Sequence, residues 1–244
     1  MAAAMSRRYL AFDLETAKLL PRTVNDVLAH RPLGIACAAA VASGLDEPIT
    51  WHGRDGDRPS AQMSRDEAGA MVDDLVALVE DGYTLVTWNG LSFDFNVLAE
   101  ESGGLDACAG LAHDHVDMMF HAVCRLGHYV ALAKAAEGFG LAGKSGGLSG
   151  HEAPALWAEG RYDEVLQYNI QDARLCLDIA REAERRGELN WITGRGRIGR
   201  MPLERGWLSV KQARRLPLPD TSWMSDPPAR DDALAWFPSG TLTD

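Results

Sequence analysis

The order of the apolar segments is the feature that most constrains the fold of this chain of 244 residues. Short apolar runs typical of buried strands come first, at residues 9–12, 35–41 and 49–51. A strand pattern over residues 83–88 is then followed by helical patterns, and the last long element, residues 162–186, is helical and ends at Gly187. Strands first, then strand and helix in alternation, predict an α/β domain with a mixed sheet.

Local patterns predict where several helices begin and end. Ser64 and Glu67 have the spacing of a capping box, and apolar residues at helical spacing follow them to Val79. Ser92 is expected to cap a helix over residues 93–101, and a further helix is predicted over residues 130–139. The Gly, Asp, Arg and Pro residues between positions 53 and 59 predict a loop.

The charge is distributed unevenly. The chain carries a formal net charge of −11, so any nucleic-acid partner would need a local basic patch or a metal ion. Residues 185–215 carry +7, which suits either a surface that follows a nucleic-acid backbone or an ordinary solvated face. From Pro217 onward, prolines and weak periodicity predict an extended tail. We expect two parts, a domain over residues 7–187 and a basic, then proline-containing, extension over residues 188–244.

The cysteines and the N-terminal residues indicate in which cellular compartment the protein is expected. The four cysteines form no CxxC pair and lie among apolar residues, which predicts buried free thiols in a reducing compartment. Residues 1–8 lack the apolar stretch of a signal peptide, and the longest apolar run, residues 33–42, is too short to span a bilayer. We therefore expect a cytoplasmic protein.

Four acidic residues occupy unusual places. Asp13 and Glu15 follow an apolar strand two residues apart, so they point to the same face of the sheet. Asp94 follows the strand predicted over residues 83–88, and Asp172 lies in the long helix four residues after Tyr168. Taken singly, these acids suit a strand that emerges into a loop, a helix start favoured by the helix dipole, and an exposed helix stripe.

Taken together, the acids predict a metal site. Two strand ends and one helix could bring them within a few ångströms of one another. At an effective dielectric constant near 20, each pair of like charges about 4 Å apart costs on the order of 4 kcal/mol. A domain of ordinary stability tolerates such a cluster only with protonation or bound divalent cations. Ligands that are all oxygen atoms suit Mg²⁺ or Mn²⁺.

Three ordered motifs resemble those of the DEDD (DnaQ-like) 3′–5′ exonuclease superfamily, which has a ribonuclease-H-like fold. The motifs are Phe12–Thr16, Asn89–Asp94 and Tyr168–Asp172. The Tyr-x-x-x-Asp spacing of the third resembles the tyrosine subclass (DEDDy), and bacterial predicted exonucleases of the DNA-polymerase-B type look most similar. Residues 140–150 also resemble a loop of those proteins. The resemblance implies a mixed β-sheet flanked by helices.

The resemblance also implies roles for individual residues. Asp13 would bridge two metal ions, Glu15 and Asp172 would help to hold the ion on the side of the nucleophile, and Asp94 would hold the second ion, partly through water. Tyr168, whose phenol is neutral at pH 7, would orient the attacking water. The expected substrate contacts are the backbone of Leu14, the hydroxyl of Thr16, and the side chains of Asn89 and Phe93.

The activity that this resemblance implies is metal-dependent removal of nucleoside 5′-monophosphates from the 3′ end of single-stranded nucleic acid, with DNA favoured over RNA. Two alternatives remain open: a structure-specific endonuclease on the same fold, and a nucleic-acid-binding module without turnover. The sequence identifies no protein partner.

Other motifs were weighed against ordinary structural roles. His113, His115 and Asp117 alternate along the chain but have no evident fourth ligand, so a surface turn with a structural Asp117 is expected. His121 and His128 are interpreted as structural. Lys144–Ser145 lacks the glycine pattern of a phosphate-binding P-loop, and a flexible loop is the favoured interpretation.

Overall fold

A computed structural model describes residues 7–141 and 150–239 of the chain. The expected loop at residues 140–150, with Lys144–Ser145, therefore lies almost wholly outside the described residues. Five strands form the main sheet in the order β3-β2-β1-β6-β7. Their bounds are β1 (Tyr9–Thr16), β2 (Ile35–Ala42), β3 (Ile49–His52), β6 (Thr84–Thr87) and β7 (Val116–Asp117). The β1–β2 and β2–β3 pairs are antiparallel, and the β1–β6 and β6–β7 pairs are parallel. The predicted mixed α/β sheet is confirmed.

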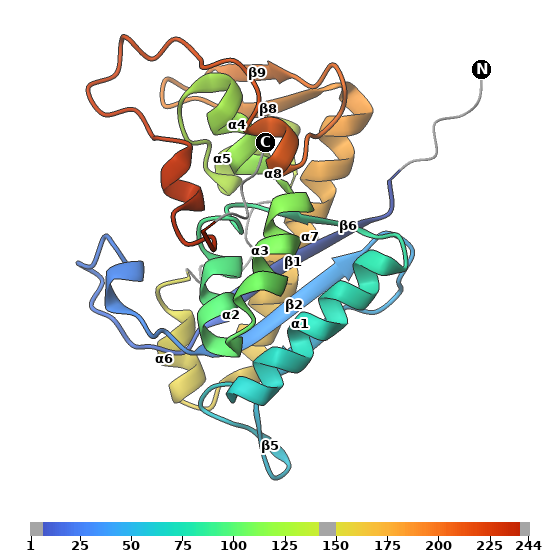
Figure 1. Cartoon of the computed structure of the whole chain (residues 1–244), viewed down its shortest axis with the longest axis vertical. Coiled ribbons are helices and arrows are strands. Elements are labelled where there is room, and N and C mark those ends of the chain that lie inside the picture. Colours follow the sequence, from blue (N-terminus) through green and yellow to red (C-terminus); the bar gives the residue numbers. More distant parts are fainter. Residues whose placement is uncertain (1–6, 142–149, 240–244) are drawn as a thin grey trace.

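Helices cover both faces of this sheet, as Figure 1 shows for α1 and α7. The described helices are α1 (Arg65–Glu80), α2 (Asp94–Ser102), α3 (Leu105–Asp114), α4 (Met118–Leu126), α5 (Leu132–Phe139), α6 (Ala153–Ala158), α7 (Tyr162–Arg186) and α8 (Val210–Ala213), with short 3₁₀ turns η1 (Leu28–His30) and η2 (Asp231–Leu234). None of these helices is long and apolar enough to cross a bilayer.

The alternation of side chains along β1 separates two cores. Leu10, Phe12 and Leu14 pack with α1, α2 and α3, whereas Tyr9 and Ala11 pack with α7 on the opposite face. The odd-numbered residues of β1 therefore point toward α7. β2 is buried along its whole length and consists mainly of small residues, which is why helices can pack closely on both of its sides.

The sequence patterns succeed where the local chemistry is strong. Ser64 and Glu67 form the predicted capping box, and α7 has the predicted bounds. All four cysteines are buried and free, as expected. The prediction for Ser92 is wrong: α2 begins at Asp94, and the preceding residue Phe93 makes no side-chain cap.

Two further differences concern short elements. The expected loop at residues 53–59 contains a small hairpin, β4 (Arg54–Asp55) and β5 (Arg58–Pro59). The sequence patterns predict neither α3 nor α6. Helix α3 consists mostly of small residues and has no side-chain cap, whereas α6 depends on Trp157, which is buried against Tyr162 and donates to the carbonyl of Ser60 at 2.9 Å.

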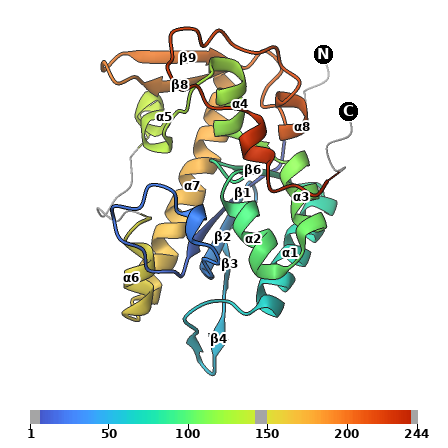
Figure 2. The same ribbon diagram turned by 60° about the vertical axis from the view of Figure 1, so that its left-hand side comes forward.

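Residues 188–239 of the predicted C-terminal extension pack on the domain. An antiparallel hairpin of β8 (Glu188–Ile192) and β9 (Ile198–Pro202) leads to the fully buried Trp207, whose indole donates to Ala180 of α7 at 3.0 Å. Beyond α8 the chain passes α4 and then approaches α2 and α3 (Figure 2). Isolated side chains, chiefly Arg230, Leu234 and Trp236, hold the chain beyond α8 against the domain. Because these contacts are isolated, the sequence of this segment has no periodic pattern.

Candidate active site

Three carboxylates meet between β1 and α7. Asp13 and Glu15 project from the same face of β1, and Asp172 projects from the buried side of α7. One carboxylate oxygen of each lies within 4.8 Å of those of the other two. The side chains of Glu15 and Asp172 are buried, and that of Asp13 is half-buried. Acids that are distant along the chain therefore form one cluster.

Small residues on β2 make room for this cluster. Asp13 pairs with Ala39 and Glu15 with Cys37 in the antiparallel register. Directly opposed residues point to the same face, so the acids lie beside side chains of low volume. Burial raises the pKa of the Cys37 thiol, and the nearby charges of Glu15 and Asp13 raise it further, so the thiol stays protonated.

Asn169 holds Asp13 in place and was not predicted from the sequence. Its Nδ2 donates to Asp13 Oδ2 at 2.6 Å, and its side chain is completely buried. Asn169 lies three residues before Asp172, so both project from the same side of α7. The spacing between Asn169 and Asp172 is the only feature of the sequence that indicates this role, and it has meaning only because Asp172 is a candidate metal ligand.

Tyr168 lies beside the same three acids. Burial raises the pKa of its phenol most strongly, the charges of Asp172 and Glu15 raise it further, and hydrogen bonding to Asp172 and the charge of Asp13 contribute as well. The hydroxyl is therefore neutral across the ordinary pH range, and it can donate or accept a hydrogen bond next to the cluster.

Asp94 reaches the site from the opposite direction. It is the first residue of α2, and its Oδ1 accepts a hydrogen bond of 3.0 Å from the backbone N–H of Leu14, between the two acids of β1. It is not part of the three-carboxylate cluster. Burial raises its pKa to about 7, the Leu14 N–H opposes this shift, and the charge of Asp117 adds to it.

The expected substrate contacts lie around this site in different environments. The side chain of Leu14 is buried in the core on the face opposite the acids, so only its backbone is at the site. Thr16 ends β1 and is half-buried, as is Phe93, which packs against the core. Asn89 adopts a left-handed backbone (φ 76°) in the turn after β6 and lines a surface hollow of about 950 Å³.

The expectation of a surface turn at His113, His115 and Asp117 is wrong for its last two members. His115 is buried, its Nδ1 donates to the Ala112 carbonyl at 2.7 Å, and its Nε2 accepts from Thr87 Oγ1 at 2.9 Å. Burial lowers the pKa of its imidazole to about 4. Asp117 is also buried and caps α4, in agreement with a structural role.

His121 has the expected structural environment. It is buried with its ring edge against Trp207, and its Nδ1 accepts from the Leu208 N–H at 3.4 Å. His128 is half-buried and makes ring contacts with Trp191 and Trp223.

Family models place the fold among known proteins. Residues 50–183 match a model described as RNase H superfamily. The chain belongs to the RNase H superfamily. The match includes Asp94 and Asp172, whereas Asp13 and Glu15 on β1 lie before its first residue. RNase H-like nucleases act on nucleic acids and use divalent metal ions, and the cluster provides acidic ligands of the kind that such ions bind.

Two further comparisons concern curated sequences and solved structures. A comparison with curated protein sequences gives no match. Among solved structures, this RNase H superfamily member is similar to the family B DNA polymerase from the hyperthermophilic archaeon Pyrobaculum calidifontis, with a TM-score of 0.51 and 23% identity. The similarity covers 72% of this chain and 24% of the polymerase, so the chain spans about a quarter of that protein's length.

The donor set fits a divalent cation. All three clustered groups are carboxylates, which Mg²⁺ and Mn²⁺ prefer, and no histidine or cysteine joins them within the described part of the chain. Mutual repulsion among three carboxylates so close together would be relieved by such an ion.

Proposed function

We propose that this protein is a metal-dependent 3′–5′ exonuclease of the tyrosine subclass, which hydrolyses phosphodiester bonds at the 3′ ends of single-stranded nucleic acid and releases nucleoside 5′-monophosphates. The observation that carries the proposal is the cluster of Asp13, Glu15 and Asp172, with Tyr168 one helical turn from Asp172. The order and spacing of the three sequence motifs support it further.

Each residue has a proposed task. Asp13, Glu15 and Asp172 hold two divalent ions, with Asp94 as the fourth acid. When bound, such ions lower the pKa of a water molecule and stabilise the entering and leaving oxygens of an in-line displacement. Asn169 fixes the orientation of Asp13.

Tyr168 is suited to orient water and not to deprotonate it, because burial and the adjacent carboxylates raise its pKa. The Leu14 backbone and Thr16 lie at the end of the acid-bearing strand, where they would contact the terminal sugar. Asn89 and Phe93 flank the turn that leads to Asp94, and a base could stack on the phenyl ring of Phe93.

We propose DNA as the preferred substrate, in keeping with the structural similarity to a DNA polymerase. The test is a degradation assay with 5′-labelled oligonucleotides of single-stranded DNA, duplex DNA and RNA. Stepwise shortening from the 3′ end in Mg²⁺ or Mn²⁺, with none in EDTA, is expected. Asp13→Asn provides the matched control for contaminating nucleases.

Several results would contradict this function. Shortening that persists in EDTA would exclude the metal site. Cleavage of a strand whose 3′ end is chemically blocked would indicate an endonuclease on the same fold. Tight DNA binding with no hydrolysis under any metal condition would indicate a binding module.

A further inference from the structure

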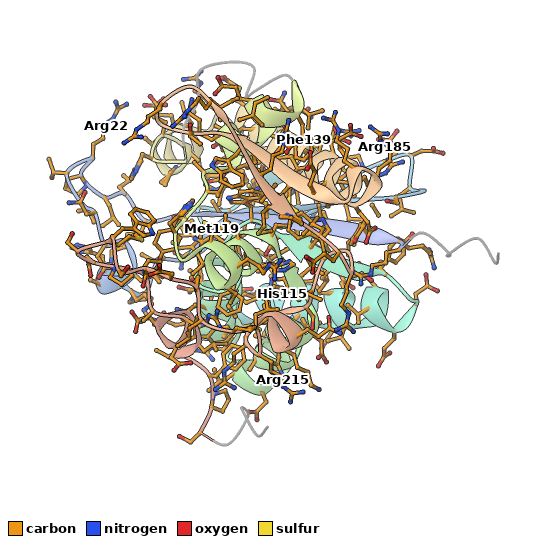
Figure 3. The ribbon with its side chains drawn as sticks, turned by 90° about the horizontal axis from the view of Figure 1, so that it is seen from above. Arg22, His115, Met119, Phe139, Arg185 and Arg215 are labelled. Atoms are coloured by element: carbon orange, nitrogen blue, oxygen red, sulfur yellow. The ribbon has the colours of Figure 1, made fainter. Side chains whose placement is uncertain are left out.

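The basic residues of the 185–215 segment lie in three places: at the end of α7, in the β8–β9 hairpin and the chain directly after it, and around α8. Arg185 and Arg186 belong to α7 and share Glu182 as an ion-pair partner, at 2.7 and 2.6 Å. Arg215 follows α8, and Figure 3 shows it on the side of the molecule opposite Arg185. Of these basic residues, only Lys211, Arg214 and Arg215 line the hollow beside α8.

Three cations at α8, and Arg230 of the C-terminal segment, gather around one hollow. Lys211, Arg214 and Arg215 line a surface hollow of about 710 Å³, together with His113 at the end of α3. Burial lowers the pKa of the His113 imidazole, the charge of Asp114 opposes this, and the charges of the three cations lower it further. The four side chains are thus close enough to influence one another.

Few acids neutralise this cluster. Asp231 forms a long ion pair of 3.8 Å with Arg214, and Asp114 lies near His113. Lys211 and Arg215 are exposed, and within residues 7–141 and 150–239 neither has a carboxylate within ion-pair distance. In a chain of net charge −11, this concentration of positive charge would attract an anionic ligand.

A second hollow adjoins this surface; none of the four candidate acids lines it, and its charged lining residues are Arg31, Arg230, Asp26, Glu100 and Asp232. The hollow of about 950 Å³ is lined by Asn89 and Ser92, from the turn that leads into Asp94, and by the exposed ring of Tyr129. The two hollows share Val123, Ala229 and Arg230 among their lining residues, so they lie on either side of the same piece of chain.

The chain between the two hollows is held firmly. Arg230 Nη2 donates to the carbonyls of Cys124 and Pro217 at 2.6 and 2.8 Å, and its Nη1 donates to Leu216 at 2.6 Å. The Trp236 indole donates to the carbonyl of Leu91 at 2.8 Å, next to the Asp94 turn. The surface on which a ligand would lie is therefore ordered beforehand.

We propose that Lys211, Arg214 and Arg215 bind backbone phosphates of a single nucleic-acid strand, upstream of the 3′ nucleotide held at the acids. The strand crosses the hollow beside Asn89, and a base stacks on Tyr129. A groove with positive charge and an exposed aromatic ring is how proteins bind single strands without regard to sequence. This inference rests on the proposed exonuclease function for the direction of the strand.

A rival basic hollow offers the matched control. It lies beside the N-terminal strand and α7, and its arginines include Arg181 and Arg205. Three acids, Asp178, Glu182 and Glu184, stand against five arginines there, so its formal charge is +2 compared with +3 for the hollow at α8. Two of these acids, Glu182 and Glu184, form ion pairs with Arg185 and Arg7. Removing two charges there changes the net charge of the protein by the same amount as removing two charges at α8.

The experiment measures binding without hydrolysis. Fluorescence anisotropy in EDTA follows a labelled single strand of about 20 nucleotides over a range of salt concentrations. The variants are Lys211→Gln with Arg215→Gln, the control Arg181→Gln with Arg205→Gln, and the charge-preserving Lys211→Arg with Arg215→Lys. Each phosphate contact with single strands contributes about 0.7 to the slope of log K against log salt, so the first variant should lose about 1.4.

The expected result is an affinity loss of roughly tenfold or more at about 0.1 M salt for the first variant, with less than about a twofold loss for the other two. An equal loss in the control, no loss in the first variant, or an equal loss in the charge-preserving variant would overturn the proposal. Because the assay requires no turnover, absence of hydrolysis in metal would refute the exonuclease function and leave this result standing.

Discussion

Acids of two kinds lie beside the same sheet and are held in opposite ways. Asp117, at the end of β7, accepts hydrogen bonds from the backbone N–H groups of Asn89, Leu91 and Phe120 at 3.1, 2.9 and 2.9 Å. Asp13 and its two partners in the three-carboxylate cluster instead face one another within 4.8 Å.

The difference shows that burial alone does not mark a functional acid. Asp117 is more buried than any member of the cluster, yet backbone donors stabilise its carboxylate and it fixes the turn before α2. The cluster places like charges together, which costs stability and has a use only if a cation binds. In this protein, the groups that surround an acid, and not how deeply the acid is buried, distinguish a structural acid from a functional one.

The largest effect is expected at Asp13. Asp13→Asn should reduce hydrolysis by at least a thousandfold, or about 4 kcal/mol of transition-state stabilisation, because a ligand of the proposed metal site is lost. The melting temperature in EDTA should stay the same or rise, because repulsion within the cluster falls. The exposed Asp114→Asn is the control, and a sharp drop in melting temperature would make Asp13 structural.

The converse is expected at Asp117. Asp117→Ala should destabilise the protein by about 3–5 kcal/mol in urea unfolding, because it leaves three N–H groups, two of them buried, without their acceptor. Asp114→Ala should change stability by less than about 0.5 kcal/mol. A stable Asp117→Ala protein that had lost activity would move Asp117 from the structural group to the functional one.

Asp94 lies between the two groups and should report through pH. Its pKa is raised to about 7 in the folded protein, above the value in the unfolded chain, so the folded state binds the proton more tightly. Its contribution to the stability of the metal-free protein is therefore complete below about pH 4 and declines as pH rises toward 7, by up to about 4 kcal/mol. Urea unfolding of wild type and Asp94→Asn across this range measures it. Parallel profiles would show that Asp94 ionises normally.

The smallest effect is expected at Tyr168. Tyr168→Phe should lower kcat by about 10- to 100-fold if the hydroxyl only orients water. Tyr162→Phe, on the same helix but packed against Trp157, is the control and should leave kcat unchanged. An unchanged kcat in Tyr168→Phe would limit the role of this ring to packing beside the cluster.

The parts of the fold predicted from sequence are those with local causes. The capping box at Ser64, the glycine that ends α7 and the apolar strands need only neighbouring residues to specify them. Helix α6 was not predicted because it depends on Trp157, whose hydrogen-bond acceptor, the carbonyl of Ser60, lies far away along the chain. The burial of His115, at the end of α3, was not predicted because it depends on contact with Thr87, which lies on β6.

The candidate site divides in the same way. Residue type and spacing were enough to nominate the four acids, since strand and helix periodicity fix which side chains share a face, and the resemblance of the third motif added Tyr168. Only tertiary structure decided that three of the acids form one cluster, that Asp94 instead binds the Leu14 N–H, and that Asn169 donates to Asp13. The physical reason is that periodicity determines direction along one element, whereas distances between elements depend on how their side chains pack, here on the small residues of β2 that let α7 approach β1.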